Sequence, residues 1–258
     1  MNKTALITGA SSGIGMEMAT VFAAQKQNLI LVARNASKLN EIAADLSAKF
    51  GIKVNVFAID LSEPNAAQKV YDYCSKQQLH IDYLVNNAGF GDFGFFAESN
   101  LEKQLQMINL NITTLTQLTH LFLPAMIKNK CGKILNVAST AAFQPGPLMS
   151  VYYATKAYVL HFSEAIANEL ESTGVTVTAL CPGATESGFQ KAADLEESKL
   201  VKGKKLPSSA EVAAYGYKAM MQGKKVAIHG FMNAIMANSI RFTPRNLVLK
   251  MVRMIQDK

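Results

Sequence analysis

The chain has 258 residues, of which 26 are Lys or Arg and 19 are Asp or Glu, giving a formal net charge of +7. This length suits one large α/β domain, and no linker, repeat or low-complexity tract divides residues 1–258. No apolar stretch reaches the roughly 20 residues of a membrane span and no secretory leader is recognisable, so we expect a cytoplasmic protein. The basic excess comes with no nucleic-acid-binding motif, which argues against a nucleic-acid partner.

The cysteines and histidines give no sign of a metal site. Cys74, Cys131 and Cys181 are widely spaced, which favours buried free thiols over disulfides. The histidines at positions 80, 120, 161 and 229 lack metal-ligand spacing and are interpreted as structural. We therefore expect no metal cofactor.

A glycine-rich turn near the N-terminus joins an apolar strand to a helical pattern. The strand is predicted at residues 3–8, and the turn has the spacing Gly-x-x-x-Gly-x-Gly, which differs from the common dinucleotide fingerprint Gly-x-Gly-x-x-Gly. A helix N-terminus after such a turn offers unpaired N–H groups and the positive end of its dipole to a phosphate. Taken alone, the turn is also compatible with a connector that binds nothing. The residues predicted to hold a phosphate are Gly9, Ser11, Ser12, Gly13, Ile14 and Gly15.

Six further strands are predicted, with helical patterns between them. They cover residues 29–34, 54–60, 83–86, 133–138, 175–181 and 225–228. This alternation predicts an α/β, doubly wound Rossmann fold, in which a seven-stranded parallel sheet carries helices on both faces within a single domain. Ligands of such sheets bind beyond the carboxyl ends of the strands, so the polar residues at those ends should share one rim.

Arg34 indicates which dinucleotide binds. It follows the second strand, about twenty residues after the glycine turn, where an acidic residue would bind the ribose of NAD and a basic one the 2′-phosphate of NADP. No Asp or Glu occurs between Leu29 and Lys38, and Lys38 adds a second positive charge nearby. The sequence therefore favours NADP(H), with NAD(H) as the weaker alternative.

Tyr152 and Lys156 lie four residues apart on one face of a predicted helix. The Lys156 ammonium is expected to lower the pKa of the Tyr152 phenol and so prepare a proton donor for carbonyl reduction. Ser139 ends the fifth strand, where its hydroxyl could hold the substrate oxygen. Tyr153 is three residues from Lys156, and we expect it to serve in packing or in the substrate pocket.

Taken together, these motifs resemble the short-chain dehydrogenase/reductase family over residues 3–228, and in detail an NADP-preferring bacterial subgroup of it. The resemblance implies catalysis by Ser139, Tyr152 and Lys156, the last two also touching the cofactor. A helical Asn completes the family's tetrad; Asn109 and Asn111 compete for this position, and we choose Asn111. It also implies cofactor contacts at Asp60, Leu61, Asn87, Ala88, Gly89, Pro182, Gly183 and Ser187, where Ser187 replaces the family's usual Thr.

The predicted function is NADP(H)-dependent interconversion of a carbonyl and an alcohol, with Tyr152 as acid and base. A dinucleotide-responsive binding protein is the alternative from another class. The aromatic and methionine content of the loops at residues 90–96 and 143–149 suggests an apolar substrate, and residues 189–206 should form a lid.

Two surfaces are predicted to meet other molecules. Small residues Ala154, Ala157 and Ala165 on the Tyr152 helix favour a homodimer or homotetramer. The C-terminal extension, residues 231–258, mixes basic and apolar residues, and we favour its packing on a partner subunit over contact with a membrane surface.

Overall fold

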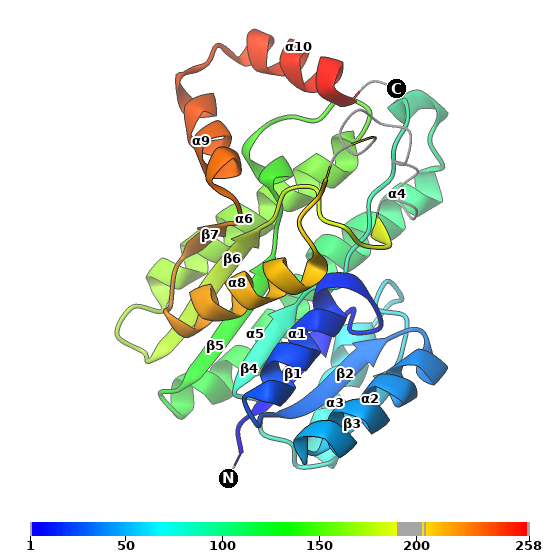
Figure 1. Cartoon of the computed structure of the whole chain (residues 1–258), viewed down its shortest axis with the longest axis vertical. Helices are drawn as coiled ribbons and strands as arrows, with labels where there is room; N and C mark the ends of the chain where they lie inside the picture. Colours follow the sequence, from blue (N-terminus) through cyan, green and yellow to red (C-terminus); the bar gives the residue numbers. More distant parts are fainter. Residues whose placement is uncertain (1, 190–202, 204, 257–258) are drawn as a thin grey trace.

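The computed structural model describes residues 2–189, 203 and 205–256. A seven-stranded sheet with strand order β3-β2-β1-β4-β5-β6-β7 crosses the molecule, and every neighbouring pair of strands is parallel (Figure 1). The strands are β1 (Thr4–Thr8), β2 (Asn28–Ala33), β3 (Val54–Ala58), β4 (Tyr83–Asn86), β5 (Gly132–Val137), β6 (Val175–Cys181) and β7 (Val226–Ile228). The predicted Rossmann fold is confirmed.

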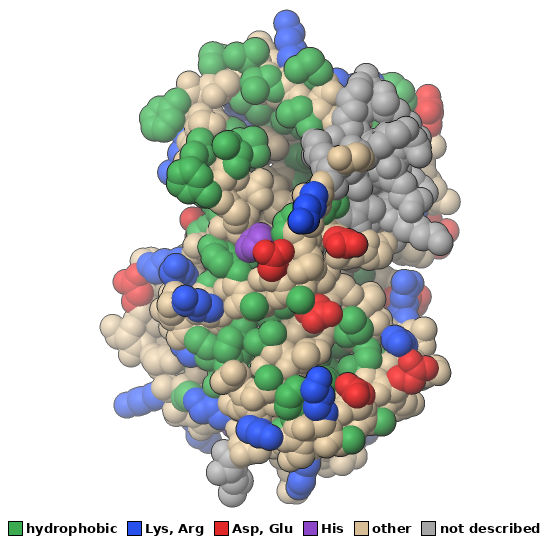
Figure 2. All heavy atoms as spheres, in the orientation of Figure 1, with side chains coloured by type: hydrophobic (Ala, Val, Ile, Leu, Met, Phe, Trp, Pro, Cys, Tyr) green, Lys and Arg blue, Asp and Glu red, His purple; other side chains and the backbone are tan. Residues whose placement is uncertain are grey.

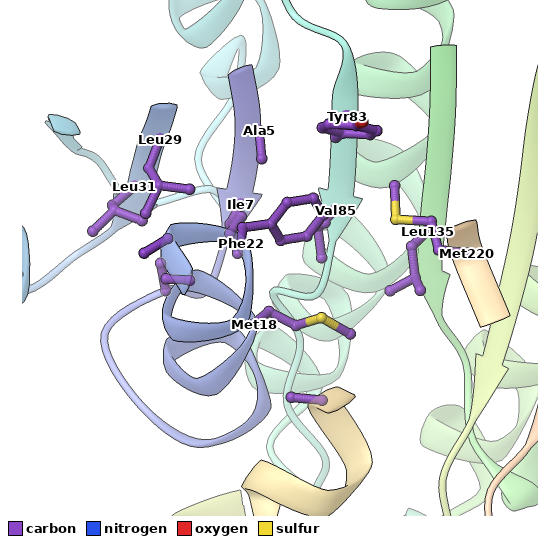
Figure 3. Packing of buried hydrophobic residues seen from close by; sticks show 14 of the residues in the cluster. Ala5, Ile7, Met18, Phe22, Leu29, Leu31, Tyr83, Val85, Leu135 and Met220 are labelled. Carbon is purple, nitrogen blue, oxygen red and sulfur yellow. The ribbon is translucent and has the colours of Figure 1, made fainter. Parts of the chain in front are cut away.

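Helices cover both faces of the sheet, and the alternation of side chains along the strands explains why. Ala5 and Ile7 of β1 belong to one buried cluster, whereas Leu6 between them belongs to another. The helices α1 (Gly13–Ala24), α2 (Ala36–Phe50) and α8 (Ser209–Met221) pack on the first face, and α3 (Ala66–Lys76), α5 (Leu115–Lys128) and α6 (Ser150–Glu169) on the second. Figure 3 shows Phe22 of α1 between β1 and Tyr83 of β4, its ring 5.3 Å from the Tyr83 ring.

Several predicted strand ends are shifted, most of them by one residue. The second strand ends at Ala33 and the third at Ala58, so Arg34 and Asp60 lie in loops rather than in strands. The cause at Arg34 is the start of α2, because the side chain of its N-cap residue Asn35 accepts a hydrogen bond from the Lys38 N–H. Both residues still follow the carboxyl ends of their strands.

The C-terminal extension forms a layer beyond the carboxyl edge of the sheet. It consists of α9 (Phe231–Ser239), a short turn η4 (Ile240–Phe242) and α10 (Arg245–Gln256) (Figure 1). Val248, Val252 and Gln256 recur every four residues and bury one stripe of α10 against this chain. Among the described residues, no helix has the length and apolar character needed to cross a bilayer.

Candidate active site

The glycine turn brings the start of α1 against the ends of β1 and β4. Gly9 has a φ of +66°, and a Cβ on Gly15 would stand 2.3 Å from the Gly9 carbonyl oxygen, so both positions require glycine. Ser12 is the N-cap residue of α1, but its side chain makes no capping hydrogen bond. The first N–H groups of α1 therefore have no side-chain acceptor there, as an anion site at a helix N-terminus requires.

Thr8 and Asn87 tie the glycine turn to the end of β4. The Thr8 Oγ1 accepts hydrogen bonds from the N–H groups of Asn87 and Ala88 at 2.9 and 3.0 Å. The Asn87 Nδ2 donates to the Thr8 carbonyl at 2.9 Å and to the Gly9 carbonyl at 3.3 Å. The Asn87 side chain thus holds the turn in place, which is a positioning task that the sequence did not reveal.

A cavity of about 770 Å³ runs from this turn to the start of α6. Its shape and lining suit a dinucleotide, since glycines and N–H donors line one end and Tyr152 and Lys156 the other. Gly15 and Asn111 are not part of the lining. The predicted residues that line it are Gly9, Ser11, Ser12, Gly13, Ile14, Arg34, Asp60, Leu61, Asn87, Ala88, Gly89, Ser139, Tyr152, Lys156, Pro182, Gly183 and Ser187.

Arg34 and Asp60 form an ion pair at the far end of the cavity. The Arg34 Nη1 lies 3.6 Å from the Asp60 Oδ2, and the Arg34 side chain is 79% exposed. Partial burial disfavours the charged form of Asp60, but hydrogen bonds from Ser62 and the Arg34 guanidinium outweigh it and lower the pKa of Asp60. The guanidinium can therefore reach an anion in the cavity while Asp60 orients it.

Tyr152, Ser139 and Lys156 converge at the other end of the cavity. The Lys156 Nζ donates to the Val137 carbonyl at 2.8 Å and lies 5.7 Å from the centre of the Tyr152 ring. The Ser139 hydroxyl donates to the Pro182 carbonyl at 3.3 Å and accepts from the Ala141 N–H at 3.1 Å. These contacts place Ser139 between β5 and the loop after β6.

The expected lowering of the Tyr152 pKa is wrong for this structure. Burial of the phenol raises the pKa of Tyr152, and the hydrogen bond with Ser139 offsets only part of that increase. Burial also lowers the pKa of Lys156 to about 8, because removing an ammonium from water disfavours its charge. The physical reason for the correction is that the phenol is fully desolvated, and burial of the phenolate charge is the largest contribution to the shift of its pKa. The phenol consequently keeps its proton at neutral pH.

A turn of π-helix decides which asparagine reaches the site. It spans Asn109–Thr114, between α4 (Leu101–Ile108) and α5, and turns Asn111 inward while Asn109 stays exposed. The Asn111 Oδ1 accepts from the Phe90 N–H at 3.2 Å, and its Nδ2 donates to the Phe90 carbonyl at 3.0 Å and to the Thr155 Oγ1 at 3.1 Å. Asn111 thereby connects α6 to the loop after β4.

The substrate end contains residues of the predicted loop and lid, together with Gln256, which the sequence did not indicate. The Phe189 ring lies 5.3 Å from the Tyr152 ring, and Met149 is buried beside it. Tyr153 is buried as expected, and its hydroxyl accepts a hydrogen bond from the Gln256 Nε2 at 2.5 Å. The sequence carries no local signal for a contact between residues that far apart. Of the predicted lid, residues 190–202 and 204 lie outside the described residues.

Comparison with known proteins identifies the class. The family model described as short chain dehydrogenase matches residues 3–198, and the chain belongs to this family of oxidoreductases. Among solved structures, the short-chain dehydrogenase from Sphingobium yanoikuyae in complex with NADPH is 31% identical with a TM-score of 0.85, and the match covers 95% of this chain and 94% of that one. The bulky-bulky ketone specific alcohol dehydrogenase from Comamonas testosteroni is 28% identical with a TM-score of 0.80, covering 93% and 92%.

Curated relatives include proteins of greater length. A very-long-chain 3-oxoacyl-CoA reductase from Phaeosphaeria nodorum is 38% identical over 67% of this chain, and the match spans 52% of the relative. An uncharacterized oxidoreductase from Staphylococcus epidermidis is 33% identical over 76% of this chain and 84% of the relative. The chain spans about half the length of the first of these relatives, and its membership of the short-chain dehydrogenase family rests on the family model.

Proposed function

We propose that this enzyme is an NADP(H)-dependent reductase of ketones or aldehydes that uses Tyr152 as its acid and base. The observation that carries the proposal is the convergence of Ser139, Tyr152 and Lys156 on the cavity that begins at the glycine turn. NADPH, when bound, supplies the hydride that the carbonyl carbon receives. The glycine turn, Asn87 and the loop at Pro182 and Gly183 would hold this cofactor.

The side chains at the reacting end then divide the remaining tasks. The Tyr152 phenol is protonated at neutral pH, and it would give its proton to the carbonyl oxygen as the negative charge develops there. The Ser139 hydroxyl, which interacts with that phenol, would hold the same oxygen. The Lys156 ammonium, 5.7 Å from the ring centre, stabilises the phenolate left behind, and Asn111 fixes the helix turn before Lys156 through Thr155.

The preference for NADP(H) is assigned to Arg34. Its exposed guanidinium borders the cavity, and a guanidinium binds a phosphate with two charge-assisted hydrogen bonds. The NADPH complex of the relative from Sphingobium yanoikuyae supports this choice. Membership of an NADP-preferring bacterial subgroup is part of the same proposal. NAD(H) remains the weaker alternative.

The substrate is proposed to be largely apolar. Phe90, Met149 and Phe189 line the cavity and pack in one cluster with Tyr152. Two relatives are named for an acyl-CoA reductase and for a bulky ketone dehydrogenase, which agrees with an apolar carbonyl substrate.

A homo-oligomer formed through α6 is supported by the exposed positions of Ala154 and Ala165. The cytoplasmic location stays a prediction.

The test is the loss of NADPH absorbance with a panel of ketones, aldehydes and diketones. We expect turnover that falls by roughly 10³-fold in Tyr152→Phe, because the proton donor is lost. Tyr153→Phe is the matched control and should keep turnover within a few-fold. NADPH binding should survive in both variants. Tight NADPH binding with no turnover of any carbonyl would instead favour the dinucleotide-responsive binding protein, and equal rates in the two variants would refute the role of Tyr152.

A further inference from the structure

The C-terminal layer exposes large apolar side chains. Phe231 is 81% exposed and Phe242 is 90% exposed, although phenylalanine is usually buried. Figure 2 shows hydrophobic side chains gathered over α9 and α10. We call this area the C-terminal apolar surface; its main members are Phe231, Met232, Met236, Phe242, Met251 and Met254.

This surface has no task in the fold of the described chain. The stripe of α10 that packs inward is formed by Val248, Val252 and Gln256, whereas Met251 and Met254 of the same helix face outward. In α9 only Ala237 is buried. Contiguous exposed apolar area of this kind marks a site of contact with a protein or a membrane.

The charges around the surface select the kind of partner. Residues 230–256 contain four basic residues, Arg241, Arg245, Lys250 and Arg253, and no Asp or Glu. The Arg253 guanidinium lies 5.0 Å from the Phe95 ring, which together with exposed Phe96 continues the apolar area on the loop after β4. Apolar side chains among the cations of residues 230–256, which contain no acidic residue, fit a bilayer surface with anionic headgroups.

From this arrangement we propose that α9, η4 and α10 attach the enzyme peripherally to anionic membranes. The 12 residues of α10 are too few to span a bilayer, so the helices lie in the headgroup region with Phe231 and Phe242 inserted. A second copy of the chain fits less well. A two-fold contact through this surface would bring like charges together with no acidic residue of residues 230–256 to pair with them.

Flotation of the purified chain with lipid vesicles tests the proposal without reference to catalysis. Vesicles of phosphatidylcholine with and without about one third phosphatidylglycerol are compared at low and high salt. We expect binding to the anionic vesicles that weakens with salt. The double variant Arg241→Gln with Lys250→Gln should bind about 30-fold more weakly, at roughly 1 kcal/mol per charge. Phe231→Ser with Phe242→Ser should abolish flotation.

Matched variants elsewhere on the surface distinguish binding at this site from non-specific adsorption of the protein to vesicles. Lys69→Gln with Lys76→Gln on α3, and Ile127→Ser on α5, remove exposed side chains of the same kinds and should float like the unaltered chain. Thermal unfolding checks that every variant is folded. Absence of flotation, or equal flotation of all variants, would overturn the proposal. So would a dimer in sedimentation that the Phe231 and Phe242 substitutions dissociate while no vesicle binds.

Discussion

The two ends of the cavity differ in the groups that form their walls. At the dinucleotide end, the glycine turn is closely packed: the Asn87 side chain donates to the Thr8 and Gly9 carbonyls, and a Cβ on Gly15 would collide with Gly9. At the substrate end, the walls are side chains, with Phe189 against Tyr152 and Gln256 bonded to Tyr153. The first end tolerates almost no added atom, whereas the second can change its shape by exchanging side chains. We therefore expect the turn to fix how a dinucleotide lies, Arg34 to select its 2′-phosphate, and side-chain packing to select the substrate.

The largest expected effect comes from Lys156→Met, which separates catalysis from stability. Turnover should fall by roughly 10²-fold or more, since the ammonium beside Tyr152 is lost. The free energy of unfolding near pH 7 should rise by about 1–3 kcal/mol, because a charge that is costly to bury disappears while the bond to the Val137 carbonyl is given up. Chemical denaturation and initial rates measure the two effects.

The pH dependence of that difference sharpens the test. The pKa of Lys156 is lowered to about 8 from 10.5, so between these pH values the unfolded chain holds more protons than the folded one. The free energy of unfolding of the unaltered protein should consequently rise with pH across this window. The difference by which it falls below that of Lys156→Met should therefore become smaller. Exposed Lys69→Met is the control and should show no such trend. A difference in free energy of unfolding between the two proteins that stays constant from pH 7 to 10 would contradict the burial of a charged Lys156.

Gly15→Ala addresses the dinucleotide end. The added Cβ would lie 2.3 Å from the Gly9 carbonyl oxygen and 2.4 Å from the Asn87 Nδ2, so the turn must shift. We expect a loss of about 1–3 kcal/mol in stability from overpacking. NADPH affinity should fall by roughly 100-fold as charge-assisted bonds to the phosphates are lost. Gly188→Ala, where an added Cβ meets nothing within 4 Å, should leave stability unchanged. Equal melting temperatures for the two variants would contradict the close packing at Gly15.

Arg34→Asp has a smaller and more selective effect. NADPH should bind about 10- to 100-fold more weakly, because two charge-assisted hydrogen bonds to the 2′-phosphate are replaced by repulsion. NADH affinity should stay the same or improve, since an acidic residue here can bind the ribose. Lys38→Gln is the milder comparison, because Lys38 is engaged with Glu41 at 2.9 Å. Fluorescence titration gives both constants, and equal losses for the two cofactors would refute the phosphate role.

The smallest effect concerns the attachment of α10 to the substrate end. Gln256→Leu removes the hydrogen bond to the Tyr153 hydroxyl and should cost about 1 kcal/mol of stability. Because α10 packs beside the substrate walls, the KM should rise more than kcat falls. Exposed Gln68→Leu on α3 serves as the comparison and should change neither quantity. A loss in kcat alone would indicate that Gln256 acts on catalysis rather than on the shape of the pocket.

Sequence patterns predicted the local motifs of the site far better than the contacts between distant elements. The glycine turn, Arg34 and the Tyr152 to Lys156 spacing are local, because each depends on residues within one strand, turn or helix. The inward turn of Asn111 depends on a single π-helical turn, which sequence periodicity does not display. The direction of the Tyr152 pKa shift depends on burial by elements distant in the sequence. The hydrogen bond between Gln256 and Tyr153 joins residues that are also far apart in the sequence.

Deuterium transfer tests the central claim most directly. NADPH labelled with deuterium on one face of its nicotinamide C4 is offered with a reducible ketone, and the alcohol is analysed by mass spectrometry. With the face that the enzyme uses labelled, we expect one deuterium on the former carbonyl carbon for each NADPH consumed, and almost no product from Tyr152→Phe. Product without label from either labelled face, or labelled product formed equally fast by Tyr152→Phe, would contradict hydride transfer assisted by Tyr152.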